Sequence, residues 1–159
     1  MTEQEFSIKY QMYSQELYTI CYGYTKNTKD AEDILQEVFL KYLNRKIEFK
    51  DILQEKYWLI RVTINACKNY VKSSFNTRVT LSQEILEAYP ENSLKKETDV
   101  LARIVKHLPK KYKEVIILYY YNSYKTNEMA LILNISLSAV KKRLERARNM
   151  IQEEMEKYL

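Results

Sequence analysis

Glycine and proline are almost missing from this chain, and their scarcity is the strongest constraint on its fold. The 159 residues include one glycine, Gly23, and two prolines. Glycine-turned hairpins, phosphate loops and dinucleotide fingerprints all need glycines at fixed positions, so these structures are excluded. Apolar residues instead recur three and four positions apart, as in the set Phe6, Tyr10, Tyr13, Leu17 and Ile20. This helical period predicts an all-α protein.

The first half of the chain is predicted to contain three helices. The pattern gives, in order, a helix over residues 2–24, a break over 23–29, a second helix, a polar loop over 44–55 and a helix over 56–73. Either Thr28 or Asp30 can cap the second helix, because both side chains accept hydrogen bonds from free backbone N–H groups.

The composition changes after the third predicted helix. Serine, asparagine and threonine become frequent, Pro90 appears, and sustained periodicity is lost apart from a possible short helix near 83–88. Helical patterning then resumes, with Pro109 in the first turn of a new helix. These shifts predict two small helical domains joined by a linker: a domain over 1–73, the linker over 74–98 and a domain over 99–159.

The chain carries few residues suited to catalysis or metal binding. It has one histidine, His107, and two cysteines far apart in sequence, Cys21 and Cys67. This inventory excludes a histidine-based triad and the usual zinc arrangements, and we expect no enzyme activity, no metal and no cofactor. The longest apolar run, 115–121, is too short to span a bilayer. We therefore expect a cytoplasmic protein without membrane insertion.

The C-terminal sequence predicts a helix-turn-helix. A helix over 125–133, with Thr126 as its cap, precedes Asn134, which tolerates the positive φ of a tight turn. Ser136 can cap a second helix whose inner face carries Val140, Leu144 and Ala147. Residues 141–148 have a net charge of +4, which suits a helix that enters a DNA groove. The alternative is a solvated helix face, but the combined turn, caps and spacing favour DNA binding.

An acidic cluster occupies the second predicted helix. Residues 30–37 carry a net charge of −4. Carboxylates in a first turn favour the helix dipole, which accounts for Asp30, Glu32 and Asp33. It does not explain why Asp33, Gln36 and Glu37 share one face, an arrangement that suits a partner with basic side chains.

The third predicted helix carries a basic face. Its members repeat at spacings of four, three and four: Arg61, Asn65, Lys68 and Lys72, with Lys56 at the start of the helix. Trp58 can either anchor the core, which we favour, or stack on an unpaired base. The tyrosines over 119–121 are likewise interpreted as core packing.

Three segments together resemble the sigma-70 family of RNA polymerase sigma factors, in its extracytoplasmic-function (ECF) class. The segment 30–39 (DAEDILQEVF) resembles the acidic helix of the family's region 2, and 58–62 with Asn65 resembles its promoter-melting helix. The segment 128–148 resembles the helix-turn-helix of region 4. The order and spacing of all three match the family.

The resemblance implies a role for each cluster. Residues that match the contacts to the β′ clamp helices of core RNA polymerase are Asp33, Gln36 and Glu37. Residues implied in contacts to the −10 DNA are Lys56, Trp58, Arg61, Asn65, Lys68 and Lys72. Residues implied in contacts to the −35 element are Ser138, Lys141, Lys142, Arg143 and Arg146. The loop over 44–55 resembles the segment that captures a flipped base, and further implied partners are the β flap and an anti-sigma factor.

Two positions depart from the family pattern. Ser138-Ala139 stands where the family often has Gly-Thr, and Asn69 replaces a frequent aspartate. Both bear on promoter specificity and leave the class unchanged. Two other functions fit the sequence less well: a DNA-binding regulator that acts without replacing the sigma subunit, and a helical scaffold with no nucleic-acid role.

Overall fold

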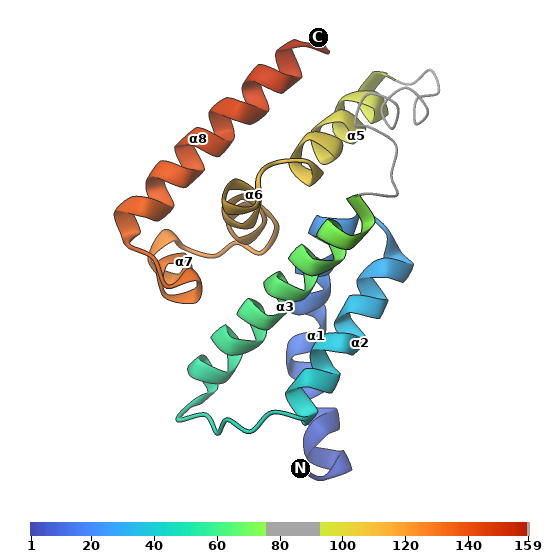
Figure 1. The fold of residues 1–159 in the computed structure, drawn as a ribbon, viewed down its shortest axis with the longest axis vertical. Helices are drawn as coiled ribbons and strands as arrows, with labels where there is room; N and C mark the ends of the chain where they lie inside the picture. The colour runs from blue at the N-terminus through green and yellow to red at the C-terminus, as the bar shows by residue number, and fades with distance from the viewer. Residues whose placement is uncertain (76–92, 159) are drawn as a thin grey trace.

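The chain is built from helices, as the sequence predicts. A computed structural model describes residues 1–75 and 93–158, and in these ranges it contains no strand. The elements, in order, are α1 (Glu3–Thr25), α2 (Thr28–Leu43), α3 (Ile52–Phe75), α5 (Ser93–Lys106), α6 (Lys110–Ile116), the π-helical turn η1 (Ile117–Tyr121), α7 (Thr126–Leu133) and α8 (Leu137–Glu156). Helices α1 to α3 form the N-terminal half, and α5 to α8 form the C-terminal half (Figure 1).

Polar side chains at the helix ends explain where α1 and α2 begin and end. Thr2 and Glu5 form a reciprocal capping box at the start of α1. Lys26 adopts a left-handed conformation with φ of 52°. The turn between α1 and α2 therefore spans only two residues and is shorter than the predicted break. Asn27 caps α2 by accepting a hydrogen bond of 3.0 Å from the N–H of Asp30. The prediction of Thr28 or Asp30 as the cap was therefore wrong.

The N-terminal half is a three-helix bundle around apolar and aromatic side chains. Leu17, Val38 and Leu59, one from each helix, are buried together. Glu55 is also buried at the base of the bundle. Its carboxylate accepts hydrogen bonds from Tyr13 of α1 and Tyr42 of α2, each at 2.7 Å. The third helix is thus tied to the first two by polar as well as apolar contacts.

The buried side chains of the C-terminal half belong to the same continuous core as those of the N-terminal bundle. The apolar run of α6 and η1 is central, and Met129 and Ile132 of α7 and Val140 of α8 are fully buried beside it. Helix α8 packs along α5, α6 and α7 (Figure 1). Pro109 immediately precedes α6, one residue earlier than predicted, where its missing N–H leaves no helical hydrogen bond unmade.

Both ends of the predicted linker belong to helices. Helix α3 continues to Phe75, and α5 begins at Ser93. The predicted short helix near 83–88 lies outside the described residues. The division into domains over 1–73 and 99–159 stays a prediction.

The two halves pack against each other, and the chain's single glycine lies at their contact. Helix α1 lies against η1, and α3 lies against α7. A Cβ atom at Gly23 would lie 2.8 Å from Cδ2 of Tyr121, which is closer than packed carbon atoms approach. Lys26 donates a 2.7 Å hydrogen bond to the hydroxyl of the same tyrosine. Burial lowers the pKa of Lys26 to about 8.

We predict that Gly23→Val lowers the free energy of unfolding by about 1–3 kcal/mol, because the added methyl groups overpack the contact with Tyr121. Urea unfolding followed by circular dichroism measures this change. Gln11→Val is the matched control, because Gln11 is exposed on the same helix. Equal stability of the two variants would show that the close approach of α1 to η1 is absent in solution.

Candidate nucleic-acid interface

The predicted helix-turn-helix is present in α7 and α8. Asn134 ends α7 with φ of 55° and ψ of 46°, the left-handed conformation that the turn requires. Ser136 caps α8 by accepting a 3.0 Å hydrogen bond from the N–H of Ala139. The predicted cap of α7 was wrong: Thr126 is already helical, and the N–H of Lys125 is bound by the Glu128 carboxylate at 3.0 Å.

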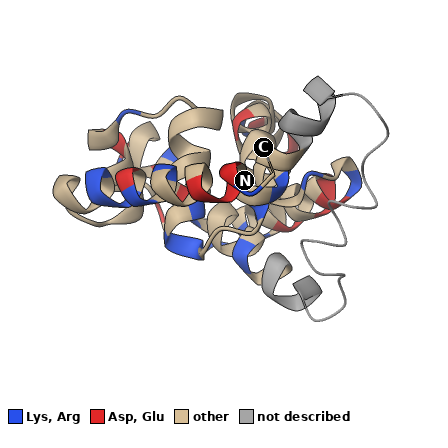
Figure 2. Cartoon of the chain, turned by 90° about the horizontal axis from the view of Figure 1, so that it is seen from above, with Lys and Arg blue, Asp and Glu red and all other residues tan. Residues whose placement is uncertain are grey.

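Helix α8 has the two faces that its sequence predicts. The inner face is buried through Val140, Leu144 and Ala147. The predicted contacts that are exposed on the outer face are Ser138, Lys141, Lys142 and Arg146. Arg143 differs, because it is half-buried and its Nη1 lies 3.4 Å from Oε1 of Glu114. Figure 2 shows that lysine and arginine, and also aspartate and glutamate, are spread over the described parts of the chain.

The basic face of α3 is turned toward the C-terminal half. Arg61 and Asn65 are exposed, but they line a cleft of about 140 Å³ that is closed on its other side by Glu114 and Leu133. Lys68 lies in the same cleft, with its Nζ 2.6 Å from Oε2 of Glu114. The side chain of Lys72 lies outside the described residues. The structure therefore brings part of the predicted −10 face against the helix-turn-helix.

The residues at the start of α3 take part in packing. The Trp58 ring is half-buried and lies 5.5 Å from the Phe49 ring and 6.4 Å from the Tyr42 ring, centroid to centroid. This placement supports the core-anchor interpretation. Lys56 contacts both halves: its Nζ lies 3.5 Å from Oε2 of Glu16 and 5.5 Å from the centre of the Tyr124 ring.

The loop between α2 and α3 contains an aromatic and cationic cluster that the sequence patterns did not reveal. The Arg45 guanidinium lies 4.1 Å from the centre of the Tyr42 ring and 5.1 Å from that of Phe49. Its Nη1 also donates to the carbonyl of Tyr42 at 2.7 Å. Arg45, Phe49 and Glu48 line an open pocket of about 290 Å³. No periodic signal marks these residues, because the loop has no regular spacing.

The acidic side of α2 faces solvent. Asp33, Gln36 and Glu37, here called the acidic face, are all exposed, and Glu37 makes an exposed ion pair of 3.2 Å with Lys41. Asp30 is different, because it accepts a hydrogen bond from Tyr70 and ties α2 to α3.

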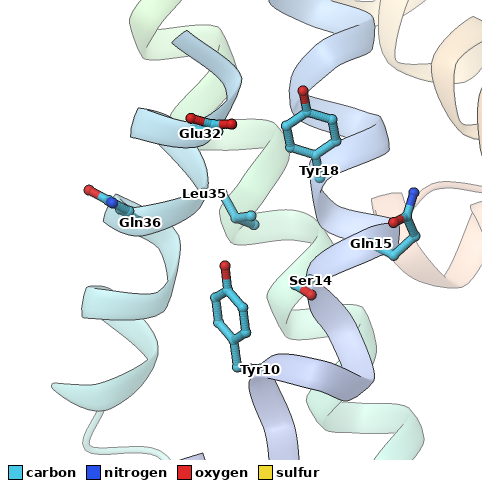
Figure 3. Close-up of a pocket in the computed structure, with 7 residues that line it drawn as sticks. All are labelled: Tyr10, Ser14, Gln15, Tyr18, Glu32, Leu35 and Gln36. Carbon is cyan, nitrogen blue, oxygen red and sulfur yellow. The ribbon is translucent and has the colours of Figure 1, made fainter. Parts of the chain in front are cut away.

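A groove of about 340 Å³ runs beside this face, between α1 and α2 (Figure 3). Gln36 lines the groove together with Glu32, Tyr10 and Tyr18. The groove and the acidic face therefore form a continuous accessible surface.

The described residues contain neither a metal-binding cluster nor a membrane-spanning helix. Among them, no group of three or more histidine, cysteine, aspartate or glutamate side chains is arranged to hold a metal ion. None of the helices in those same ranges has the length and apolar character needed to cross a bilayer.

Sequence comparison identifies both halves. The profile of "Sigma-70 region 2" matches residues 10–75, and that of "Sigma-70, region 4" matches residues 98–151. The ECF RNA polymerase sigma factor SigM of Bacillus subtilis is 32% identical over 150 residues, covering 90% of each chain. SigW of the same organism is 29% identical over 162 residues, covering 91% of this chain and 85% of SigW.

Solved structures share the fold across both halves. CnrH, solved in complex with the cytosolic domain of CnrY, superposes with a TM-score of 0.69 at 18% identity, covering 96% of this chain and 88% of CnrH. The sigma factor RpoE of Bartonella quintana, solved in complex with the anti-sigma factor NepR, gives a TM-score of 0.62 at 20% identity. The superposition covers 96% of this chain and 98% of RpoE.

A helical chain with a region 2 fold followed by a region 4 helix-turn-helix is a transcription initiation factor of the sigma-70 type. The protein belongs to the ECF class of RNA polymerase sigma factors. The comparisons support this class and give no support to a regulator that acts without replacing the sigma subunit. Sigma factors are non-catalytic and work together with RNA polymerase.

The buried carboxylate of Glu55 predicts an acid-dependent loss of stability. Burial raises its pKa, but hydrogen bonds from Lys9, Tyr42 and Tyr13 outweigh burial and hold the pKa below the ordinary value of 4.5. A carboxyl group whose pKa is lower in the folded state stabilises the fold above its unfolded pKa. That contribution is lost as the pH falls below about 4.5 toward the folded value.

We predict that Glu55→Gln lowers the free energy of unfolding at pH 7 by about 1–3 kcal/mol, because its buried partners lose their charged acceptor. The variant should also lose less stability than the wild type between pH 5 and pH 3. Urea unfolding at a series of pH values measures both effects. Parallel curves for the two proteins would contradict the role given to this carboxylate.

Proposed function

We propose that this sigma factor docks on core RNA polymerase through the acidic face of α2. Asp33, Gln36 and Glu37 are exposed, and in the described structure only Glu37 among them has an ion-pair partner, the exposed Lys41. An exposed pair of this kind contributes little to stability, so a basic partner can replace it. The partner implied by the family resemblance is the pair of clamp helices of the β′ subunit.

We further propose that α8 reads the −35 element. Its outer cations are exposed along one side of a well-capped helix, which is the arrangement that places a recognition helix in a major groove. Lys141 and Lys142 would neutralise phosphates, and Arg146 would contact phosphate or a guanine edge. Ser138 lies in the first turn of the helix, where its hydroxyl can donate to the backbone of DNA. The β flap would hold this half on the enzyme.

The −10 DNA is assigned to α3 and to the loop before it. Arg61 and Asn65 are exposed on one face of α3, and the Arg45–Phe49 cluster lies in the neighbouring loop. An unpaired base gains stacking energy on aromatic or guanidinium surfaces, which offsets the cost of leaving the duplex. The accessible contacts of the −10 site are therefore Arg61, Asn65 and this loop.

An anti-sigma factor is the remaining proposed partner. CnrH and RpoE superpose on both halves of this chain, and both were solved with such a partner or with a cytosolic partner domain. A partner of this type would control when the acidic face and the basic surfaces become available.

The exposed acidic face carries this proposal, and transcription by purified core polymerase tests it. We predict that the wild-type chain directs initiation at a small set of promoters on a genomic template. The double variant Gln36→Ala/Glu37→Lys should bind core polymerase at least ten-fold more weakly, because it removes a charge contact and introduces a like charge. Circular dichroism should remain unchanged, because both side chains are exposed.

Glu153→Lys is the matched control, because it makes a charge reversal at an exposed position of α8 far along the chain from α2. Equal affinity of the double variant and this control for core polymerase would reject the assignment of the acidic face. Failure of the wild-type chain to stimulate any initiation would reject the proposed function as a whole.

A further inference from the structure

We propose that the buried carboxylate of Glu114 holds the free sigma factor in a closed form in which the chain covers part of its own DNA-binding surface. Promoter engagement then requires this carboxylate to release cations from both halves. The inference rests on the proposed function, since it takes the cations of α3 and α8 as DNA contacts.

The geometry joins three elements at one side chain. The side chain of Glu114, on α6, is only 7% exposed, and both of its oxygens are occupied. Oε2 lies 2.6 Å from Nζ of Lys68 on α3, and Oε1 lies 3.4 Å from Nη1 of Arg143 on α8. These three residues are called the Glu114 cluster below. One cation comes from the predicted −10 set and the other from the predicted −35 set.

A carboxylate in this position competes with DNA phosphate. Lysine and arginine bind a carboxylate and a phosphate through the same charge-assisted hydrogen bonds. The Nζ of Lys68 and the Nη1 of Arg143 are held at Glu114 in this form, and transfer of both cations to phosphates would leave the carboxylate unpaired unless it reached water. Separation of the halves and transfer of the cations to DNA are therefore linked.

The cleft at the Glu114 cluster is too small for nucleic acid. Its volume of about 140 Å³ holds only a few water molecules, each of which occupies about 30 Å³ in the liquid. Arg61 and Asn65 of α3 line it on one side, and Leu133 of α7 lines it on the other. Helix α7 therefore lies beside the part of the basic face of α3 that Arg61 and Asn65 provide.

The remaining contacts between the halves combine apolar packing, as at Gly23 against Tyr121, with polar contacts. Several are polar: Lys26 binds the Tyr121 hydroxyl at 2.7 Å, and Asn122 donates to the carbonyl of Glu16 at 3.1 Å. Groups of this kind exchange their partners for water when an interface opens, in contrast to a purely apolar contact. The pKa of Lys26, lowered by burial, also indicates that the closed form places a charged group in an unfavourable environment at neutral pH.

Glu114→Gln in the full-length chain tests the inference. The amide keeps the size of the side chain but removes the charge that holds both cations. With a labelled duplex carrying a promoter found in the transcription assay, we expect the free variant to bind at least ten-fold more tightly than the wild type. If only a fraction of the free protein is open, its apparent DNA affinity equals the affinity of the open form multiplied by that fraction. The variant should be open throughout, so its affinity is not reduced in this way. Small-angle X-ray scattering should give a larger radius of gyration.

Glu145→Gln is the charge-matched control. Glu145 is exposed among the cations of α8, so its replacement makes the same change in net charge close to the DNA. We expect a change of less than three-fold in affinity and no change in the radius of gyration. Equal behaviour of the two variants, with the wild type active in transcription, would overturn the inference and leave the proposed function standing.

Two further measurements keep the test decisive. Initiation by the assembled holoenzyme should be equal for Glu114→Gln and the wild type, because the cluster is already broken there. If Glu114→Gln fails to fold, Gly23→Val opens the same interface at the contact of α1 with η1 and should give the same gain in DNA affinity. No gain in either variant would reject the closed form as a barrier to DNA binding.

Discussion

The buried carboxylate of Glu114 is the interaction on which the arrangement of the two halves depends. It lies at the junction of α3, α6 and α8 and binds one cation from each half. An uncompensated charge in a buried site is strongly destabilising, whereas a paired one is close to neutral relative to apolar packing. The junction is therefore specific without being strongly stabilising, which is the property required of an interface that must form and separate.

A second constraint acts at the same interface, where α1 meets η1. Gly23 lets α1 approach η1 so closely that any side chain at this position would contact the Tyr121 ring. A π-helical turn supplies that ring, and such turns are rare and occur mostly as single turns within α-helices. The apolar packing of α1 against η1 and the ionic pairing at Glu114 together fix how region 4 lies on region 2. The acidic face of α2 and the groove beside it remain open in this arrangement (Figure 3).

The sequence predicted the class of fold and much of the candidate site, because those features depend on local rules. Helical period, the left-handed Asn134 and the Ser136 cap are readable from a few neighbouring residues. The predicted helix caps were wrong where neighbouring polar residues competed for the same position. Asn27 caps α2 in place of Thr28, and Thr126 lies one residue inside α7. The side chain of Trp58 packs in the way that the conservative interpretation expected.

The contacts between the halves could not be predicted from local patterns. Lys68 and Arg143 have the spacing of solvent-facing cations, and nothing near them in sequence indicates that both bind a residue on α6. Glu114 follows a stretch rich in lysine and precedes the apolar run 115–121, so the sequence gives no signal that its carboxylate is buried. Pairing between residues so far apart is set by how the helices pack. The loop cluster at Arg45 and Phe49 escaped prediction for a related reason, since irregular backbone has no period to read.

The interdomain distance, measured in the free chain and on core polymerase, tests the account most directly. Dyes at Ser7→Cys on α1 and Glu153→Cys on α8 would report it by energy transfer, because both positions are exposed and the native Cys21 and Cys67 are buried. The account predicts a single short distance in the free protein and a longer one after core polymerase binds. An unchanged distance, or a long distance already present in the free chain, would contradict it.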